Sequence, residues 1–306
     1  FMISLVTYIV FGLLGLFFVG SWLIVPKGLG NLNEVILLAL PFGIVSTLEI
    51  LTPTMTRWMV NDVLGGENLG IFAVGARLAS VVSLYVSSFQ TAWGPFSLSI
   101  YKEKKAINTY NLVLKIFVFI ACIFVLILTF FSDWLVVLIT SEHYISASFL
   151  FFPLAIGLVI QASGWITEIG ISISKKSYLA IYGFFLFILV TLGITYFLSP
   201  IYGIYIVSIG LMFGYIIKAI VNSWFAQRAY SMNWEYKNIL LFFLYILMFG
   251  FFASWVKQEL DSNIAYLYFV NFLVILACLW IGWSLLLSRS EHIKIKEWIV
   301  SKGLNN

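Results

Sequence analysis

The chain has 306 residues, of which 62% are hydrophobic and only 10% carry a charge. Soluble domains typically contain about 25% charged residues, so this composition, with a mean hydropathy of +1.05, excludes a soluble globular protein and indicates an all-α polytopic membrane protein. The formal net charge of +4 excludes little by itself, because in a membrane protein the placement of charge matters more than its sum.

Apolar runs long enough to cross a bilayer follow one another along the chain. Their connections are short, which is typical of an antiparallel helical bundle. About nine transmembrane helices are therefore predicted, at 3–25, 34–60, 69–100, 109–131, 145–172, 177–198, 201–226, 237–256 and 264–286.

Lysine and arginine residues gather on one side of the predicted bundle. If the spans alternate in direction, 14 of them fall on the same side, whereas Lys257 is the basic residue outside the spans on the other. The positive-inside rule then makes the basic side, and with it the C-terminus, cytoplasmic. The 14 residues, two of which we place at the end of span 201–226, are Lys27, Lys102, Lys104, Lys105, Lys115, Lys175, Lys176, Lys218, Arg228, Lys237, Arg289, Lys294, Lys296 and Lys302.

The two ends of the chain add further expectations. An odd number of spans places the N-terminus outside, and the chain begins abruptly at Phe1, so we expect the C-terminal portion of a longer protein. Run 3–25 lacks the basic flank and the cleavage pattern of a signal peptide. At the other end, residues 290–302 mix lysines with isoleucines and Trp298, which fits either a helix on the inner leaflet or a solvated tail.

Three of the predicted spans carry polar residues at helical spacing. A charged side chain inside a spanning helix is costly and by default marks a cavity, an ion pair or a pathway. Residues three or four apart share one helix face, so three such stripes predict the walls of one aqueous cavity. The stripes are Ser46, Glu49, Pro53 and Arg57; Arg77, Ser80, Ser83, Ser87, Gln90 and Gly94; and Gln161, Trp165, Glu168 and Ser172.

The depth of each charge separates the alternatives. Arg77 lies eight residues inside its span, about 12 Å deep, which favours a cavity or an ion pair over snorkelling to the surface. Arg57 is about one turn from the outer end, so an interfacial anchor and a cavity cation both remain open. Glu49, near mid-membrane, either lines the cavity or neutralises an arginine. Glu168 is expected to be wetted from the cytoplasm.

The remaining polar and aromatic candidates are less specific. The seam that ends in Gln90 fits a cavity wall, but serine and glycine also mediate close packing of membrane helices. Trp93 and Trp165 are either packing aromatics or platforms for a sugar ring, and packing is the favoured interpretation for each alone. Gln161 belongs to the third stripe.

Motifs of catalysis are absent from the sequence. It contains two histidines, His143 and His292, and no HExxH, GxSxG, Walker A or CxxC pattern. Cys122 and Cys278 lie inside apolar runs, where a thiol is a small packing residue. We therefore expect neither an enzyme nor an ATP-driven pump, and no metal cofactor.

Several stretches resemble a known family. GIFAVGARLAS and SFQTAWGPFSLSIYKEK, within residues 70–104, are similar to the eighth transmembrane helix of bacterial polysaccharide/O-antigen flippases. These are the Wzx-like oligosaccharide translocases of the MATE-like multidrug/oligosaccharidyl-lipid/polysaccharide superfamily. RWMVNDVLGGENLGIFAV, EIGISISKKS and IYGIYIVSIGLMFGYIIKA resemble the family's helices seven to eight, ten and twelve. The order and spacing of these motifs carry the resemblance.

The resemblance implies an architecture of two six-helix bundles plus an extra helix pair. In that scheme residues 1–32 are the last helix of a missing N-terminal bundle plus a connecting loop. Residues 33–228 are the C-terminal six-helix bundle, and 229–306 are the two extra transmembrane helices and a cytoplasmic tail. The chain then corresponds to a MATE-like bundle that lacks most of its N-terminal half.

The resemblance also implies a function. The family moves oligosaccharides linked to undecaprenyl diphosphate from the inner to the outer leaflet of the bacterial plasma membrane, by alternating access. Expected partners are this lipid-linked cargo, membrane lipids, a polysaccharide polymerase and glycosyltransferases, but no nucleic acid; no cofactor is expected beyond a coupling proton or sodium ion. Arg57 falls on the family's helix-seven arginine, with Thr56 in place of the acidic residue that often precedes it. Arg77 stands where a basic or aromatic residue is common.

Two alternative functions remain at this point. A multidrug or cation antiporter of the same superfamily would use carboxylates such as Glu49 to bind its coupling ion, although two arginines against one deep glutamate favour an anionic cargo. A membrane-embedded polysaccharide polymerase or ligase is disfavoured, because such enzymes usually carry catalytic residues on a large outer loop and this chain has none.

Overall fold

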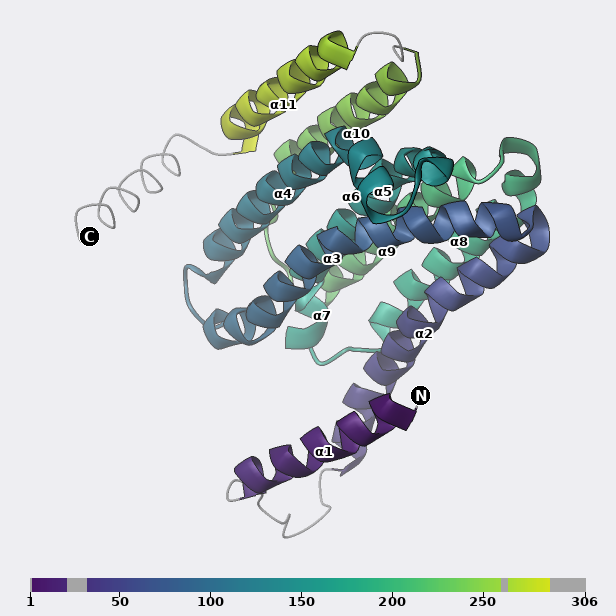
Figure 1. The fold of residues 1–306 in the computed structure, drawn as a ribbon. Coiled ribbons are helices and arrows are strands. Elements are labelled where there is room, and N and C mark those ends of the chain that lie inside the picture. The colour runs from purple at the N-terminus through teal and green to yellow at the C-terminus, as the bar shows by residue number, and fades with distance from the viewer. Residues whose placement is uncertain (1, 21–31, 260–263, 287–306) are drawn as a thin grey trace. The chain divides into compact units, whose positions relative to one another are not determined.

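The computed structural model describes residues 2–20, 32–259 and 264–286, and within these ranges the chain is helical and contains no β-strand (Figure 1). Eight helical stretches are long and apolar enough to cross a membrane, which confirms the all-α polytopic membrane class. α1 (Met2–Val19) contains a shorter apolar stretch, Leu5–Phe18. The end of predicted span 3–25 lies outside the described residues, as does the tail at 290–302.

Eight of the predicted spans correspond to observed helices, with boundaries that differ by a few residues. The long helices are α2 (Leu32–Leu64), α3 (Gly66–Ile100), α4 (Ala106–Phe130), α6 (Ser148–Thr167), α8 (Leu179–Tyr202), α9 (Tyr205–Ala229), α10 (Tyr236–Glu259) and α11 (Ile264–Leu286).

Predicted span 145–172 is not one continuous helix. A 3-10 helix, η2 (Glu142–Ala147), precedes α6, and a short helix, α7 (Ile169–Ile173), follows it. The break falls at Glu168, whose φ of −84° and ψ of 1° leave the helical region. A hydropathy window averages over such a break, because the residues on both sides of it are equally apolar.

The connection between α4 and η2, predicted to be a loop, contains a further helix, α5 (Ser132–Ile139). Asp133 lies in its first turn, where a negative charge is favourable next to the helix dipole. Val136 is buried and Leu138 is exposed, so α5 packs on the bundle by one face.

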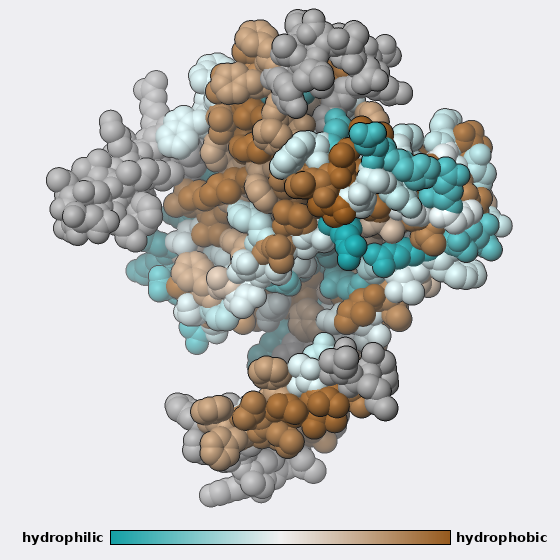
Figure 2. Space-filling model, viewed as in Figure 1, coloured by the Kyte–Doolittle hydropathy of each residue, from teal (hydrophilic) through white to brown (hydrophobic). Residues whose placement is uncertain are grey.

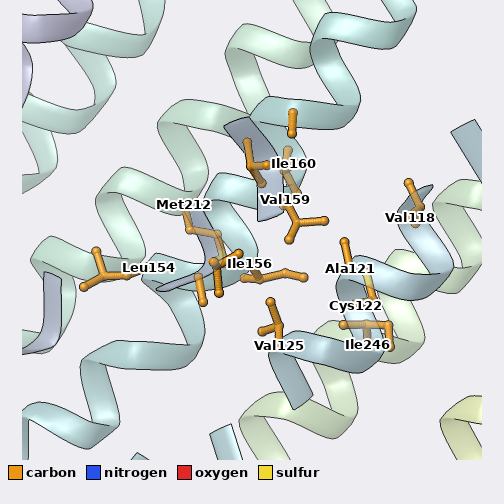
Figure 3. Packing of buried hydrophobic residues seen from close by; sticks show 14 of the residues in the cluster. Val118, Ala121, Cys122, Val125, Leu154, Ile156, Val159, Ile160, Met212 and Ile246 are labelled. Carbon is orange, nitrogen blue, oxygen red and sulfur yellow. The ribbon is translucent and has the colours of Figure 1, made fainter. Parts of the chain in front are cut away.

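The chain divides into two compact units, one ending at Leu37 and the other beginning at Leu38. In the second unit the core is built around α6, the most buried of the spans. Figure 3 shows its side chains Ile156 and Val159 packed with Ala121 of α4 and Ile246 of α10. The predicted division at residues 32 and 228 stays a prediction.

α9 packs along both α6 and α8, and glycines allow the close approach. A Cβ at Gly157 of α6 would lie 3.3 Å from the Cα of Met212. A Cβ at Gly183 of α8 would collide with the side chain of Asn222. Small residues at interfaces are the usual means by which membrane helices approach closely, and here they place the polar side chains of α9 between two neighbouring helices.

The segment between α9 and α10 is fastened to α4. Lys115 Nζ lies 2.6 Å from Glu235 Oε2. Asn111 donates from Nδ2 to the carbonyl of Asn233 at 3.0 Å and accepts at Oδ1 from the amide of Glu235 at 3.0 Å. The side chain of Lys115 is only 2% exposed, so this residue, counted among the cytoplasmic charges, is a buried partner of the connecting segment.

The surface of the described helices is largely apolar, as a bilayer requires. Brown, apolar residues cover much of the face seen in Figure 2. Large side chains such as Phe197 of α8 and Trp280 of α11 are exposed. In a soluble protein such exposure would mark a liability for aggregation, whereas in a membrane protein it is the lipid-facing surface.

Candidate functional site

A cavity of about 260 Å³ lies among α2, α3, α6, α8 and α9. The polar lining comes mainly from α2 and α3, and the apolar lining mainly from α6, α8 and α9. The lining residues are Glu49, Thr52, Pro53, Thr56, Arg57, Phe72, Ala76, Ala79, Ser80, Ser83, Leu154, Leu158, Gln161, Phe184, Phe187, Leu211 and Tyr215. The structure thus brings to one space six of the stripe residues singled out in the sequence: Glu49, Pro53, Arg57, Ser80, Ser83 and Gln161.

The wall formed by α2 follows from a four-residue repeat. Glu49, Pro53 and Arg57 share one helix face, and Thr52 and Thr56 flank it. The two threonine hydroxyls donate back to carbonyls of their own helix, at 2.7 and 2.9 Å, as is common for threonine inside a helix. Pro53 has no amide hydrogen and therefore leaves the backbone carbonyl of Glu49 without its helical donor.

Glu49 is bound from two neighbouring helices. Lys218 Nζ of α9 lies 2.5 Å from Glu49 Oε1, and Gln161 Nε2 of α6 donates to the same oxygen at 3.4 Å. Lys218 also lies 5.1 Å from the centre of the Phe184 ring. The expectation that Glu49 could neutralise an arginine is wrong, because its partner is Lys218.

Lys218 is the residue that sequence reasoning missed. We placed it at the cytoplasmic end of span 201–226 and counted it toward the topology. The structure places it in the interior of α9, with a side chain only 7% exposed. The signal was present: Tyr215, Lys218 and Asn222 follow one another at steps of three and four, as the polar residues of the other stripes do.

A second polar group joins the end of α6 to α9. Asn222 Nδ2 donates to Glu168 Oε2 at 2.7 Å, and the hydroxyls of Thr167 and Ser223 lie 2.5 Å apart. Glu168 is partly exposed but does not line the cavity. It therefore has a specific partner on α9, whereas its wetting from the cytoplasm stays a prediction.

Arg57 lines the cavity and is exposed. It lies seven residues from the end of α2, about 10 Å along the helix. Within the described ranges it makes no ion pair or hydrogen bond. The cavity wall therefore presents a guanidinium without a protein counter-charge, whereas its carboxylate, Glu49, is already paired.

The predicted seam of α3 is divided between two surroundings. Ser80 and Ser83 line the cavity, whereas Arg77 and Gln90 are exposed and lie outside its lining. α3 begins at Gly66, three residues before the predicted span, so Arg77 is about 16 Å from the start of the helix. Among the described residues, the guanidinium of Arg77 has no hydrogen-bond or ion-pair partner.

Trp93 belongs to the core and not to the cavity. It is 5% exposed, stacks on Phe89 with ring centres 6.0 Å apart, and meets Tyr110 edge-on at 5.4 Å. Its indole nitrogen has no hydrogen-bond partner. Trp165 is partly buried against the same core. Both tryptophans take the packing role that was favoured over a sugar platform.

Comparison with known proteins gives one informative match. The chain is 25% identical over 141 residues to the capsular polysaccharide biosynthesis protein CapF of Staphylococcus aureus. The match covers 45% of this chain and 36% of that protein, so it spans little more than a third of the relative's length. No protein-family model and no solved structure matches the chain.

Proposed function

We propose that the chain takes part in the translocation of a lipid-linked oligosaccharide across the membrane for surface polysaccharide biosynthesis. The similarity to a capsular polysaccharide biosynthesis protein supports the pathway, and the eight apolar helices support a membrane role. The resemblance of residues 70–104 and of the other motifs to Wzx-like flippases favours transport of the cargo over a chemical step on it.

The charge of the cavity carries the proposal. Glu49 is matched by Lys218 at 2.5 Å, so the guanidinium of Arg57 is the charge left without a protein partner in the lining. A diphosphate brings negative charge into a low-dielectric region, where arginine is the favoured partner because it binds phosphate oxygens in pairs. The cargo chemistry that best fits this cavity is therefore an anionic lipid-linked sugar such as undecaprenyl-diphosphate oligosaccharide.

The transport would proceed by alternating access, with the cavity exposed in turn to each side of the membrane. In this proposal, helices α2 to α9 form one of the two bundles that alternating access needs. A proton or a sodium ion is proposed as the coupling ion, and the polymerase and glycosyltransferases of the same pathway are the proposed partners, all in the bacterial plasma membrane.

A multidrug or cation antiporter fits the charges less well. Such a transporter binds its cation at carboxylates inside the membrane. Here Glu49 is bound by Lys218 and Gln161, and Glu168 by Asn222. Neither carboxylate is free to take a cationic drug without first losing a partner on the protein.

The test replaces Arg57 in the full-length protein, expressed in cells that lack the native copy. Arg57→Ala should lower surface polysaccharide roughly tenfold or more, the loss expected for one charge-assisted contact, and lipid-linked repeat units should accumulate on the cytoplasmic leaflet. Arg57→Lys should retain part of the activity. Arg228→Ala is the matched control, since it removes an arginine that stacks on Trp224 at 3.8 Å, away from the cavity.

The location of the repeat units separates the outcomes. Normal export by Arg57→Ala at normal expression would remove the arginine from the mechanism. If deletion of the gene leaves single repeat units exposed on the outer leaflet, the protein acts after translocation and the proposed function is wrong.

A further inference from the structure

α2 is attached to the rest of its unit in an unusual way. From Leu38 onward it approaches the backbones of the other described helices only at isolated points. Val45 packs against α7 and α8 at one end, and Val60 joins the main core near the other. Between these two contacts α2 passes over the cavity as its outer wall.

Glu49 supplies the polar attachment of this wall. Of the side chains in residues 38–64, that of Glu49 is the one that makes hydrogen bonds or an ion pair to other helices. Its partners are Lys218 and Gln161. The hydroxyls of Thr47, Thr52 and Thr56 bond to carbonyls of α2 itself. Glu49 therefore supplies the ionic tie between α2 and α9, in addition to the apolar contacts of Val45 and Val60.

Lys218 is a cation held just behind that carboxylate. Glu49 lines the cavity and its side chain is 31% exposed, whereas that of Lys218 is 7% exposed and outside the lining. Glu49 thus covers the ammonium from the cavity side. The ammonium has three N–H donors, and a phosphate that enters the cavity competes with Glu49 for those on the cavity side.

We infer that Lys218 is a second binding residue for the anionic group of the cargo, masked by Glu49, and that the exchange of partners releases α2. The phosphate takes the ammonium, the Glu49 carboxylate loses its strongest contact, and the direct tie between α2 and α9 at this turn opens. This inference rests on the proposed function, since it assigns a residue and a gate to the same cargo.

The first experiment measures the binding of inorganic pyrophosphate to the purified full-length protein. Glu49→Gln removes the competing carboxylate and should tighten binding at least about fivefold, the lower range of ordinary coupling between sites. Lys218→Gln should weaken binding by a similar factor. The double variant Glu49→Gln/Lys218→Gln leaves no charge to bury, folds without an orphaned ion, and should bind about as weakly as Lys218→Gln.

The second experiment reports on the movement of α2. Thr52 is 5% exposed in the cavity wall, so Thr52→Cys should react slowly with a water-soluble maleimide, and Cys122 and Cys278 are buried. Pyrophosphate should speed the reaction severalfold. In the Glu49→Gln/Lys218→Gln background the reaction should be fast from the start and insensitive to pyrophosphate.

The outcomes separate the exchange of partners at Lys218, the inferred latch, from the proposed function. Equal pyrophosphate affinity in the wild type and the double variant, or a Thr52→Cys reaction that pyrophosphate leaves unchanged, overturns the inference. If the affinities follow the expected order but cells without the protein still export lipid-linked sugars, the masked anion site stands and the proposed cargo is wrong. If export depends on the protein and the affinities do not differ, the latch alone fails.

Discussion

At the scale of single residues, Lys175 is the one described non-glycine residue with a positive φ. It lies at the end of α7 with a φ of +57°. Its amide donates to the carbonyl of Ser172, and the amide of Lys176 to that of Ile171, each at 3.1 Å. This is the helix ending in which glycine is usual, because a side chain in the left-handed conformation costs about 1 kcal/mol.

Replacing Lys175 by glycine should therefore stabilise the protein. Its side chain is exposed, so Lys175→Gly should raise the free energy of unfolding by about 1 kcal/mol, measured by thermal unfolding in detergent. Lys176→Gly, next along the chain and without a positive φ, is the matched control. It should be neutral or destabilising, and an equal gain in both variants would rule out backbone strain as the cause.

The cavity residues show which part of a site a single sequence can reveal. Glu49, Arg57 and Gln161 were found because a polar residue at helical spacing is conspicuous in an apolar span. Lys218 was not, because a lysine near the end of a span also fits the positive-inside rule, and only packing against α2 distinguishes the two roles. Trp93 carries a polar atom into an aromatic cluster, and no sequence pattern tells such a residue from a cavity aromatic.

At the scale of helices, hydropathy located the eight long elements but not their internal breaks. A spanning helix must satisfy its backbone internally, so apolar length alone predicts it well. The interruption at Glu168 depends on tertiary contacts instead. A Cβ at Gly170, just beyond it, would lie 2.7 Å from the carbonyl oxygen of Ala226, so the chain there is drawn close to α9.

The contact of α8 with α9 gives a sharp prediction. Gly183→Ala would drive a methyl group into Asn222 and should destabilise the protein by roughly 1–3 kcal/mol, the usual cost of overpacking. Gly193→Ala, in the same helix with open space around it, should be neutral or stabilise by up to about 1 kcal/mol, because alanine favours helix. Thermal unfolding of the two variants side by side measures the difference, and similar midpoints would contradict the packing.

At the scale of the whole molecule, α10 and α11 pack directly on the bundle, and the segment between α9 and α10 adds a polar junction. Asn111 binds this segment by both atoms of its amide, and Lys115 by its ammonium. Orientation in the membrane stays a prediction. It rests on charge placement. Without Lys115 and Lys218, which lie inside the bundle, twelve basic residues are still predicted on one side, against Lys257 on the other.

Loss of the Asn111 amide should loosen this junction. Asn111→Leu removes both hydrogen bonds and should increase hydrogen exchange in residues 230–235 at least about tenfold, the factor that corresponds to one or two lost bonds. Asn108→Ala, on the exposed side of the same helix, should leave the exchange unchanged. Unaltered exchange in Asn111→Leu would show that the ion pair of Lys115 holds the segment alone.

Pro53 gives α2 a mechanical property of its own. A helix resists bending because every turn is cross-linked by hydrogen bonds, and the turn from Glu49 to Pro53 lacks one of them. The helix is therefore weakened at the turn that also carries its polar anchor, as it is at its other internal proline, Pro41. Bending of α2 therefore concentrates at this turn, between the packed side chains of Val45 and Val60.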